Sequence, residues 1–434
     1  MMEIIPTKQS FRHYLFFWSG QLFSLFGSSI VQFAIIWWIT IETGNPIFLA
    51  IASTLYILSS VIVLPFAGVL SDKLNKKQLI LIADSSQVVA TLILILLFAM
   101  NIVNVYLVFV IISVRSIFQA IHLPTVNSII PAMVPKDKLT RINGINYLFT
   151  GLVELTAPFV GAALLFIFAV YQVFWLDLIT FAIAVIPLLS IKIPSVHDVN
   201  KEPDKSFIKE FRIGFRTLRI IPGLFIIIIL SMFQNFLTRP ILSLMSFYVY
   251  VIHSGSALDF AIVMGLMQGS MIIGALYTSI KKTWKHQISA YFLGLIIINV
   301  GYLMFAFVPI GFILMIGVSA AVFGLCFPIV NSLYQTMVQT VVPKDKIGRI
   351  TSIDFALSLA ITPIASLASG FLAEAFGLTT LILYCAIISI ILTVPVWNLF
   401  VRRKINYQDE NFIQTTKIRL EEMNGVKKDG RISY

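Results

Sequence analysis

Charged residues and cysteines are scarce in this sequence, and each scarcity excludes a class of protein. Asp, Glu, Lys and Arg make up 12% of the 434 residues, about half of their share in an ordinary soluble domain. The two cysteines, Cys326 and Cys385, fall within predicted helices and indicate no disulfide framework. The sequence also lacks a P-loop, a His/Cys cluster and a Ser/His/Asp arrangement. We therefore expect no enzyme activity, no metal and no cofactor.

Apolar residues are abundant instead, at 58% of the chain, and they form long runs. A globule of this size cannot hide so much apolar surface from water, so lipid must cover it. Runs of roughly 20 apolar residues match the hydrocarbon thickness of a bilayer, whereas the alternating ten-residue strands of a membrane β-barrel are absent. We predict an all-α membrane protein with twelve transmembrane helices, at about 14–41, 47–70, 78–100, 104–130, 140–169, 171–192, 223–250, 257–280, 287–308, 311–340, 348–375 and 377–401.

The basic residues are distributed asymmetrically over these spans. The formal net charge is +11, and 29 of the 31 Lys and Arg residues lie in the termini or in and beside the loops after spans 2, 4, 6, 8 and 10. The other two, Arg115 and Arg239, lie within spans. An excess of Lys and Arg marks the cytoplasmic side of a membrane protein. We therefore expect a multi-pass protein of the cell membrane with both termini in the cytoplasm, and we expect the bilayer rather than nucleic acid as the partner of its basic residues.

A short charged phrase occurs twice and divides the chain into related halves. VPKDKLTRI at 134–142 and VPKDKIGRI at 342–350 differ at two of nine positions, and the similarity extends upstream into the preceding spans. We predict two pseudo-symmetric six-helix bundles. The expected segments are a first bundle at 1–192, a central cytoplasmic loop with a basic amphipathic helix at 193–222, a second bundle at 223–401 and a cytoplasmic tail at 402–434.

The loop after span 2 carries a recognisable motif. It reads GVLSDKLNKKQ, which resembles the G-x-L-x-D-R-x-G-R-K/R signature of the major facilitator superfamily. Lys73 and Asn75 replace the first arginine and the second glycine of that signature. The resemblance implies the major facilitator fold, in which the loop acid contacts the second half and helps to close the cytoplasmic side. It thus implies a cytoplasmic gate formed by Gly68, Asp72, Lys76 and Lys77.

Other segments resemble one branch of that superfamily. ISVRSIFQAIHLP in span 4 is similar to the arginine-bearing fourth helix of drug:proton antiporters. TAPFVGA in span 5 is similar to their Gly-Pro-x-x-Gly-Gly helix: Pro158 and Gly161 match, while Ala157 and Ala162 replace glycines. Residues 18–45 most resemble the macrolide-efflux transporters. Together these resemblances imply an exporter that exchanges its substrate for protons.

Arg115 and Glu154 are the leading candidates for this coupling, because ionisable groups inside a bilayer are costly and usually functional. They lie on consecutive helices, and their sequence midpoint falls in the 134–138 loop. An antiparallel hairpin therefore places both at a similar depth, where an ion pair or a shared polar cavity is possible. Gln119 and His122 share the helical face of Arg115. We expect Glu154 to carry protons or to bind cationic groups; the alternative is that it only neutralises Arg115.

Two further polar faces are expected to line the cavity. In the family fold the first and seventh helices face each other across it; the alternative is that their polar residues form hydrogen bonds between helices without a ligand. Span 1 presents Gln21, Ser24, Ser28 and Gln32, and span 7 presents Gln234, Asn235, Thr238 and Arg239. We expect Asp177 to be a structural partner in the outer third of span 6, and Trp37 and Trp38 to lie at the outer membrane interface.

The sequence thus predicts a monomeric exporter of small amphipathic molecules, resembling macrolide-efflux transporters, that uses the proton gradient as its energy source. Two alternatives remain open. An exporter of an endogenous compound, such as a siderophore, a peptide or a lipid-derived molecule, would have the same cavity residues. A membrane scaffold or receptor would keep the fold without transport, and the restriction of the Arg115 and Glu154 charges to one half disfavours it.

Overall fold

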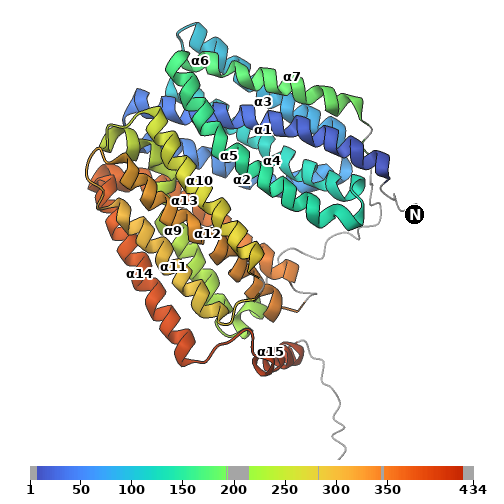
Figure 1. The fold of residues 1–434 in the computed structure, drawn as a ribbon, viewed down its shortest axis with the longest axis vertical. Helices are drawn as coiled ribbons and strands as arrows, with labels where there is room; N and C mark the ends of the chain where they lie inside the picture. The colour runs from blue at the N-terminus through green and yellow to red at the C-terminus, as the bar shows by residue number, and fades with distance from the viewer. Residues whose placement is uncertain (1–6, 192, 194–214, 282, 344–346, 424–434) are drawn as a thin grey trace, which may run out of the picture.

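The computed structural model describes residues 7–191, 193, 215–281, 283–343 and 347–423 (Figure 1). Within the helices, the surroundings of a few residues, Gly68 and Asp72 among them, are not described. In the described part of the chain, twelve helices are long and apolar enough to cross a membrane. The twelve predicted spans and the all-helical fold are thus confirmed.

The first half of the chain supplies six of these spans. Span 6 is interrupted at Phe174, so a four-residue helix precedes its main part. The helices are α1 (Lys8–Thr43), α2 (Pro46–Lys73), α3 (Lys76–Ala99), α4 (Val105–Met133), α5 (Leu139–Ile167), α6 (Val170–Val173) and α7 (Trp175–Ser190).

The second half supplies the other six spans and one short helix beyond them. Its first helix continues into a π-helical turn at Tyr248–Ile252. The helices are α9 (Leu224–Phe247), α10 (Ala257–Ile280), α11 (Gln287–Phe305), α12 (Ile313–Val341), α13 (Ile347–Phe376), α14 (Leu378–Arg402) and α15 (Glu410–Met423).

Asparagine caps let the early helices reverse direction over short connections. Asn45, Asn75 and Asn104 precede α2, α3 and α4, and the side chain of each accepts a hydrogen bond from a backbone N–H in the first turn of its helix. Such a cap satisfies a donor that the helix itself leaves unpaired. Between α1 and α2, Gly44 adopts the left-handed conformation with φ 54°, which lets the chain turn directly into the Asn45 cap.

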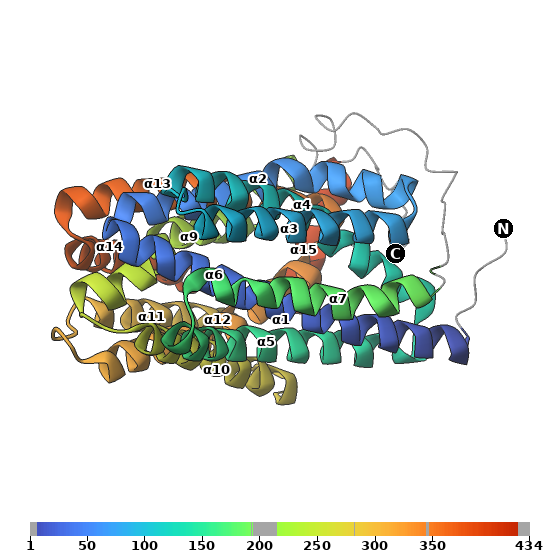
Figure 2. The same cartoon turned by 90° about the horizontal axis from the view of Figure 1, so that it is seen from above.

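The two halves converge at one side of the molecule and spread apart at the other (Figure 1). We call the side that carries the start of α1 and helix α15 the terminal side, and the opposite one the distal side. In Figure 2, the long helices of the first half run roughly side by side between these two sides. Helix α2 packs against α13, and α5 packs against α10, so these two pairs join the halves.

Hydrogen bonds between the halves gather toward the distal side. Thr40 on α1 donates to Ser246 on α9 at 2.8 Å. Gly370 on α13 allows an even closer approach, because a Cβ at this position would lie 2.4 Å from the Cβ of Ala50 on α2. The halves are therefore in tight contact on this side.

Aromatic rings extend the distal contact. Phe33 and Trp37 on α1 both stack on Phe260 of α10, with ring centroids 5.2 and 6.0 Å apart. Trp37 and Trp38 are each only 7% exposed, and Trp38 packs edge-on against Phe98. Both rings are used in helix packing, and the expectation that the Trp pair lies at the outer membrane interface stays a prediction.

The C-terminal tail is tied to the second half. The Tyr407 hydroxyl donates to the carbonyl of Pro222, just before α9, at 2.7 Å. The Gln408 amide donates to the carbonyl of Trp284 in the α10–α11 loop at 2.6 Å. Helix α15 packs against α12. Residues 207–214 of the predicted amphipathic helix of the central loop lie outside the described residues, whereas 215–220 are helical and Leu218 is fully buried.

Candidate functional site

A cavity of about 760 Å³ lies between the halves, within the size range of small-molecule sites. Six helices of the first half and two of the second line it: α1, α2, α3, α4, α5, α7, α9 and α10. Phe33, Phe260 and Ser246 belong both to its wall and to the distal contacts. The cavity is therefore closed on the distal side, and the spread of the bundles leaves it facing the terminal side.

A buried ion pair occupies one wall of this cavity. Arg115 on α4 and Asp177 on α7 are 5% and 2% exposed, and Arg115 Nη1 lies 2.5 Å from Asp177 Oδ2. The hydroxyl of Thr91 donates to the same carboxylate oxygen at 2.6 Å, and that of Ser28 donates to Oδ1 at 2.7 Å. Hydrogen bonds of this kind offset the cost of burying both charges. The cluster is electrically neutral and fixed entirely within the first half.

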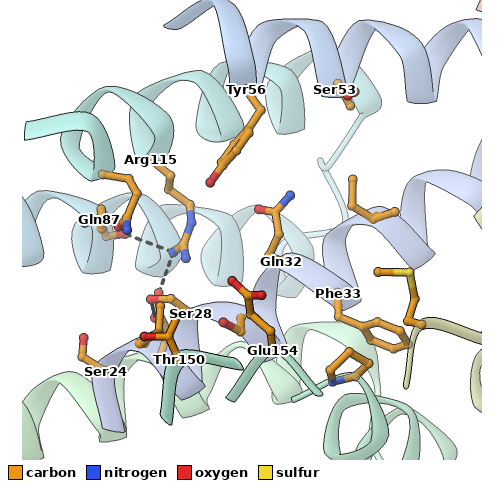
Figure 3. Close-up of a pocket in the computed structure, with 18 of the residues that line it drawn as sticks. Ser24, Ser28, Gln32, Phe33, Ser53, Tyr56, Gln87, Arg115, Thr150 and Glu154 are labelled. Atoms are coloured by element: carbon orange, nitrogen blue, oxygen red, sulfur yellow. Dashed lines mark hydrogen bonds and ion pairs between the residues drawn. The ribbon is translucent and has the colours of Figure 1, made fainter. Parts of the chain in front are cut away.

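The pairing differs from the ion pair between Arg115 and Glu154 that the hairpin geometry suggested. Arg115 also donates to the carbonyl of Gln87 on α3 at 3.4 Å (Figure 3). Its side chain thus points from α4 toward α3 and α7. Equal depth along two helices does not fix how each is rotated about its axis, and this rotation selects Asp177. Of the two predicted possibilities for Arg115 and Glu154, the ion pair is therefore wrong, whereas the shared polar cavity is present.

Glu154 is exposed to the cavity and holds a different partner. Its carboxylate accepts a hydrogen bond at 2.7 Å from the amide of Gln268, which lies on α10 in the opposite half. Among the described residues, no Lys, Arg or His nitrogen lies within 4.0 Å of this carboxylate. Figure 3 shows Glu154 rising from α5 into the cavity, with Arg115 and Gln87 on another wall. Glu154 is thus a carboxylate in contact with both halves and without a cationic neighbour.

A second polar cluster contains the cavity's histidine. His122 Nε2 lies 3.2 Å from Asp84 Oδ1 and 2.9 Å from Gln21 Oε1. Both neighbours are acceptors, so Nε2 carries a hydrogen. The Gln21 amide in turn contacts Asp84 Oδ2 at 3.5 Å. Helices α1, α3 and α4 each contribute one residue, so this cluster also belongs wholly to the first half.

The predicted polar faces of the first half do line the cavity. The span 1 residues occur at intervals of three or four along α1, and Gln119 lies between Arg115 and His122 on α4. Tyr56 and Thr150 add further hydroxyl groups. The residues of these two predicted faces in the lining are Gln21, Ser24, Ser28, Gln32, Arg115, Gln119 and His122.

The predicted span 7 face does not line this cavity. Gln234 points away from it, toward α14, where its amide donates to the hydroxyl of Thr393 at 2.8 Å and to the carbonyl of Ser389 at 3.3 Å. None of Gln234, Asn235, Thr238 and Arg239 belongs to the described lining. The contributors from α9 lie further toward the distal end, where the halves meet: Leu242, Ser243, Met245 and Ser246.

The predicted gate residues are described only in part. Lys76 donates to the carbonyl of Ser128 on α4 at 3.1 Å. Lys77 donates to the carbonyls of Leu189 and Ile191 at 2.6 and 2.8 Å, and so caps the C-terminal end of α7. Both lysines thus tie the α2–α3 turn to the first half. Gly68 and Asp72 lie outside the described surroundings, and the gate role of the four residues stays a prediction.

Two partners, Thr91 and Gln268, were not singled out from the sequence. Asp177 was expected to be a structural partner, which agrees with its buried ion pair to Arg115. Gln268 is an amide in the middle of a predicted span, between Gly265 and Gly269. An intramembrane polar residue beside small residues is the signal that marks such a contact between helices.

Two six-helix halves, a cavity between them and polar groups held inside the membrane region define a secondary transporter. The model of the Major Facilitator Superfamily matches residues 17–359. The chain belongs to this superfamily, and it is a membrane transporter rather than an enzyme.

Individual relatives are distant. Macrolide efflux protein A of Streptococcus pyogenes is 25% identical over 360 residues, which cover 83% of this chain and 89% of that protein. The staphyloferrin A transporter of Staphylococcus aureus is 22% identical over 416 residues, or 94% and 98% of the two chains. A crystal structure of the nucleoside transporter NupG shares the fold with a TM-score of 0.73, at 15% identity, over 89% of this chain and 99% of that one.

Proposed function

We propose that the chain exports amphipathic organic molecules that carry a basic group, of the macrolide type, in exchange for protons. The observation that carries the proposal is the Glu154 carboxylate, which is exposed in the cavity, has no cationic neighbour in the described structure and bonds across to Gln268. An organic cation and a proton would compete for this one carboxylate. Such competition is the simplest basis for exchange.

Two other features of the cavity support this role: the ion pair of Arg115 and the apolar part of the wall. Asp177 compensates Arg115, so the arginine does not neutralise Glu154. The cavity wall also offers apolar area for a large substrate, including Phe33, Phe260 and Met264. Aromatic and methionine side chains adapt to varied apolar surfaces. A molecule with a basic group and a bulky apolar body fits this combination.

The transport cycle follows from the placement of Glu154. When the cavity faces the terminal side, the ionised carboxylate binds the basic group of the substrate. The halves then rock about the cavity and open the distal side, where a proton replaces the substrate on Glu154. The protein then returns, with Glu154 protonated, to the conformation in which the cavity faces the terminal side, and Glu154 releases the proton there. No cofactor takes part, and the proton gradient supplies the energy.

We further propose that the terminal side, with both termini, lies in the cytoplasm of a bacterial plasma membrane. The excess of Lys and Arg in the termini and in the loops on that side supports this orientation. The cavity is complete within one chain, so a monomer suffices for transport. Export from the cytoplasm would lower the intracellular concentration of an antibiotic, and so confer resistance.

The test is transport in proteoliposomes under an imposed pH gradient, with a labelled macrolide as the probe. The wild type should concentrate the macrolide against its gradient, whereas Glu154→Gln should lose this pH-driven accumulation, because the proton and the basic group of the macrolide both lose their carboxylate. Glu374→Gln is the matched control, because Glu374 is exposed at the distal end of α13. If transport by Glu154→Gln depended on the pH gradient as it does in the wild type, Glu154 would not be the proton carrier. If the wild type moved no macrolide, macrolides would not be the substrate class.

A second candidate is export of an endogenous compound such as a siderophore. The 22% identical relative that spans 94% of this chain is a staphyloferrin A transporter, and this likeness favours the alternative. The same proteoliposomes loaded with carboxylate siderophores distinguish the two substrates. A scaffold or receptor would move neither.

A further inference from the structure

Arg239 is a membrane-embedded cation whose donors are mostly unused. It lies on α9 and is partly buried, and its Nε donates to the hydroxyl of Ser366 on α13 at 2.9 Å. A guanidinium has five N–H donors, and no other hydrogen bond from Arg239 exists among the described residues. No carboxylate in that part of the chain lies within 4.0 Å of it. A cation in the membrane region without a counterion calls for an anionic partner.

Three serine hydroxyls surround the point at which Arg239 meets the other helices. Ser366 Oγ lies 3.2 Å from Ser243 Oγ on α9 and 3.5 Å from Ser53 Oγ on α2. Ser53 and Ser243 are 3.3 Å apart. The hydroxyls thus form a triangle with the guanidinium on one side. All four residues are donors that can turn toward one anion.

The triangle is divided between the two halves. Ser243, Ser366 and Arg239 belong to the second half, whereas Ser53 belongs to the first. Ser53 and Ser243 line the large cavity, while Ser366 is fully buried behind them. When the halves part on the distal side, Ser53 leaves with α2. The other three remain together, and their donors are then exposed to the opening.

We propose that Arg239, Ser243 and Ser366 form a binding site for a compact anionic group, covered by Ser53 in the described state and uncovered when the distal side opens. The anion is either a free inorganic ion or an acidic group of a transported molecule. Binding would favour the distally open state, because only that state exposes Ser366 together with Arg239 and Ser243. The site does not depend on the identity of the exported molecule or on the role of Glu154.

The first experiment measures thermal unfolding of the purified full-length protein in sodium gluconate. Sodium chloride, sodium phosphate or sodium acetate is added at constant ionic strength. We expect at least one of these anions to raise the midpoint in a saturable manner, and Arg239→Gln to abolish the rise. Arg402→Gln is the control, because Arg402 is exposed at the end of α14. A response to chloride or phosphate assigns a free ion, and a response to acetate alone assigns a carboxylate of the cargo. Equal responses in Arg239→Gln and Arg402→Gln overturn the proposal, as does the absence of any response.

A second measurement keeps Arg239 in place, in case its replacement prevents folding. A cysteine introduced at Leu242, which lines the cavity beside Ser243, reports on the local potential. An anionic thiol reagent should react faster than a cationic one of equal size by about fivefold, because a nearby unit charge acts on the two in opposite directions. The anion identified above should slow the anionic reagent selectively. If both reagents reacted at equal rates and the anion changed neither rate, the proposed anion site would be contradicted.

Discussion

The Arg115 guanidinium and the Asp177 carboxylate lie 2.5 Å apart inside the first half, and this pair leaves Glu154 free of any described cation. Two carboxylates that line one cavity therefore have different surroundings. Asp177 is buried, bonded by Thr91 and Ser28, and holds α7 to α3 and α4. Glu154 is exposed in the cavity and meets the other half. The position of the arginine separates the structural acid from the one proposed to carry protons.

Asp177→Asn should destabilise the protein strongly, because it leaves Arg115 buried without a counterion. Breaking a buried ion pair costs about 3–5 kcal/mol. The double variant Arg115→Gln/Asp177→Asn should recover part of that loss, since it buries no unpaired charge. Thermal unfolding in detergent measures both. If the double variant were less stable than Asp177→Asn, the unpaired charge of Arg115 would not be the cause of the destabilisation.

Gln268→Ala should shift the balance between the two orientations of the cavity. The hydrogen bond from Gln268 to Glu154 joins the halves, and its loss is worth about 1 kcal/mol, or roughly fivefold in population. Distances between spin labels on the two halves report the shift toward the distally open state. Gln234→Ala is the control, since the Gln234 amide bonds only to α14 within its own half. An identical distance distribution in both variants would contradict the prediction.

Gly370→Ala should loosen the distal contact. The new Cβ would lie 2.4 Å from that of Ala50, so α2 and α13 must separate. Gly144→Ala is the matched control, because no atom lies within 4 Å of a Cβ there and both changes raise helix propensity equally. A cysteine placed at Ser246 should react severalfold faster with a reagent added on the distal side in Gly370→Ala. A rate equal to that in Gly144→Ala would show that the contact adapts without opening.

His253 should make stability depend on pH. It follows the π-helical turn at the distal end of α9 and is 3% exposed. Burial lowers the pKa of this imidazole below its ordinary value of about 6.5, although the Pro309 carbonyl opposes the shift. The unfolded chain therefore binds the proton more tightly, so the contribution of His253 is full above that value and is lost as the pH falls below it.

Thermal unfolding between pH 8 and pH 5 measures this dependence. The midpoint of the wild type should fall as the pH drops below about 6.5. His253→Gln should show a smaller fall than His286→Gln, since His286 is exposed on the terminal side. Equal slopes in the two variants would assign the pH dependence to other groups.

Span positions were predictable from the sequence because hydrophobic length and loop charge act locally along the chain. The start of α2 after Asn45 and the end of α4 before Pro135 each follow from the nearest few residues. The two halves were predictable as well, since the repeated phrases at 134–142 and 342–350 fall at corresponding places in the chain, between α4 and α5 and between α12 and α13.

Side-chain partners were less predictable, since they depend on how each helix is rotated against neighbours far away in sequence. The partner of Arg115 is Asp177, which lies on α7, 62 positions later in the sequence. Gln234 was expected to face the cavity, yet it faces α14, which is 159 positions away at Thr393. A polar stripe on one helix indicates that something polar is nearby, but packing decides which neighbour supplies it.

The tail that docks through Tyr407 and Gln408 also bears on how the protein is made. These residues leave the ribosome after all twelve spans, yet they bond to Pro222, where the second half begins, and to Trp284 between α10 and α11. Until then, the Pro222 and Trp284 carbonyls have no contact with the tail. The second half therefore gains this contact only after all of its spans have been synthesised, and a chain shortened before Tyr407 would insert every span and still lack it.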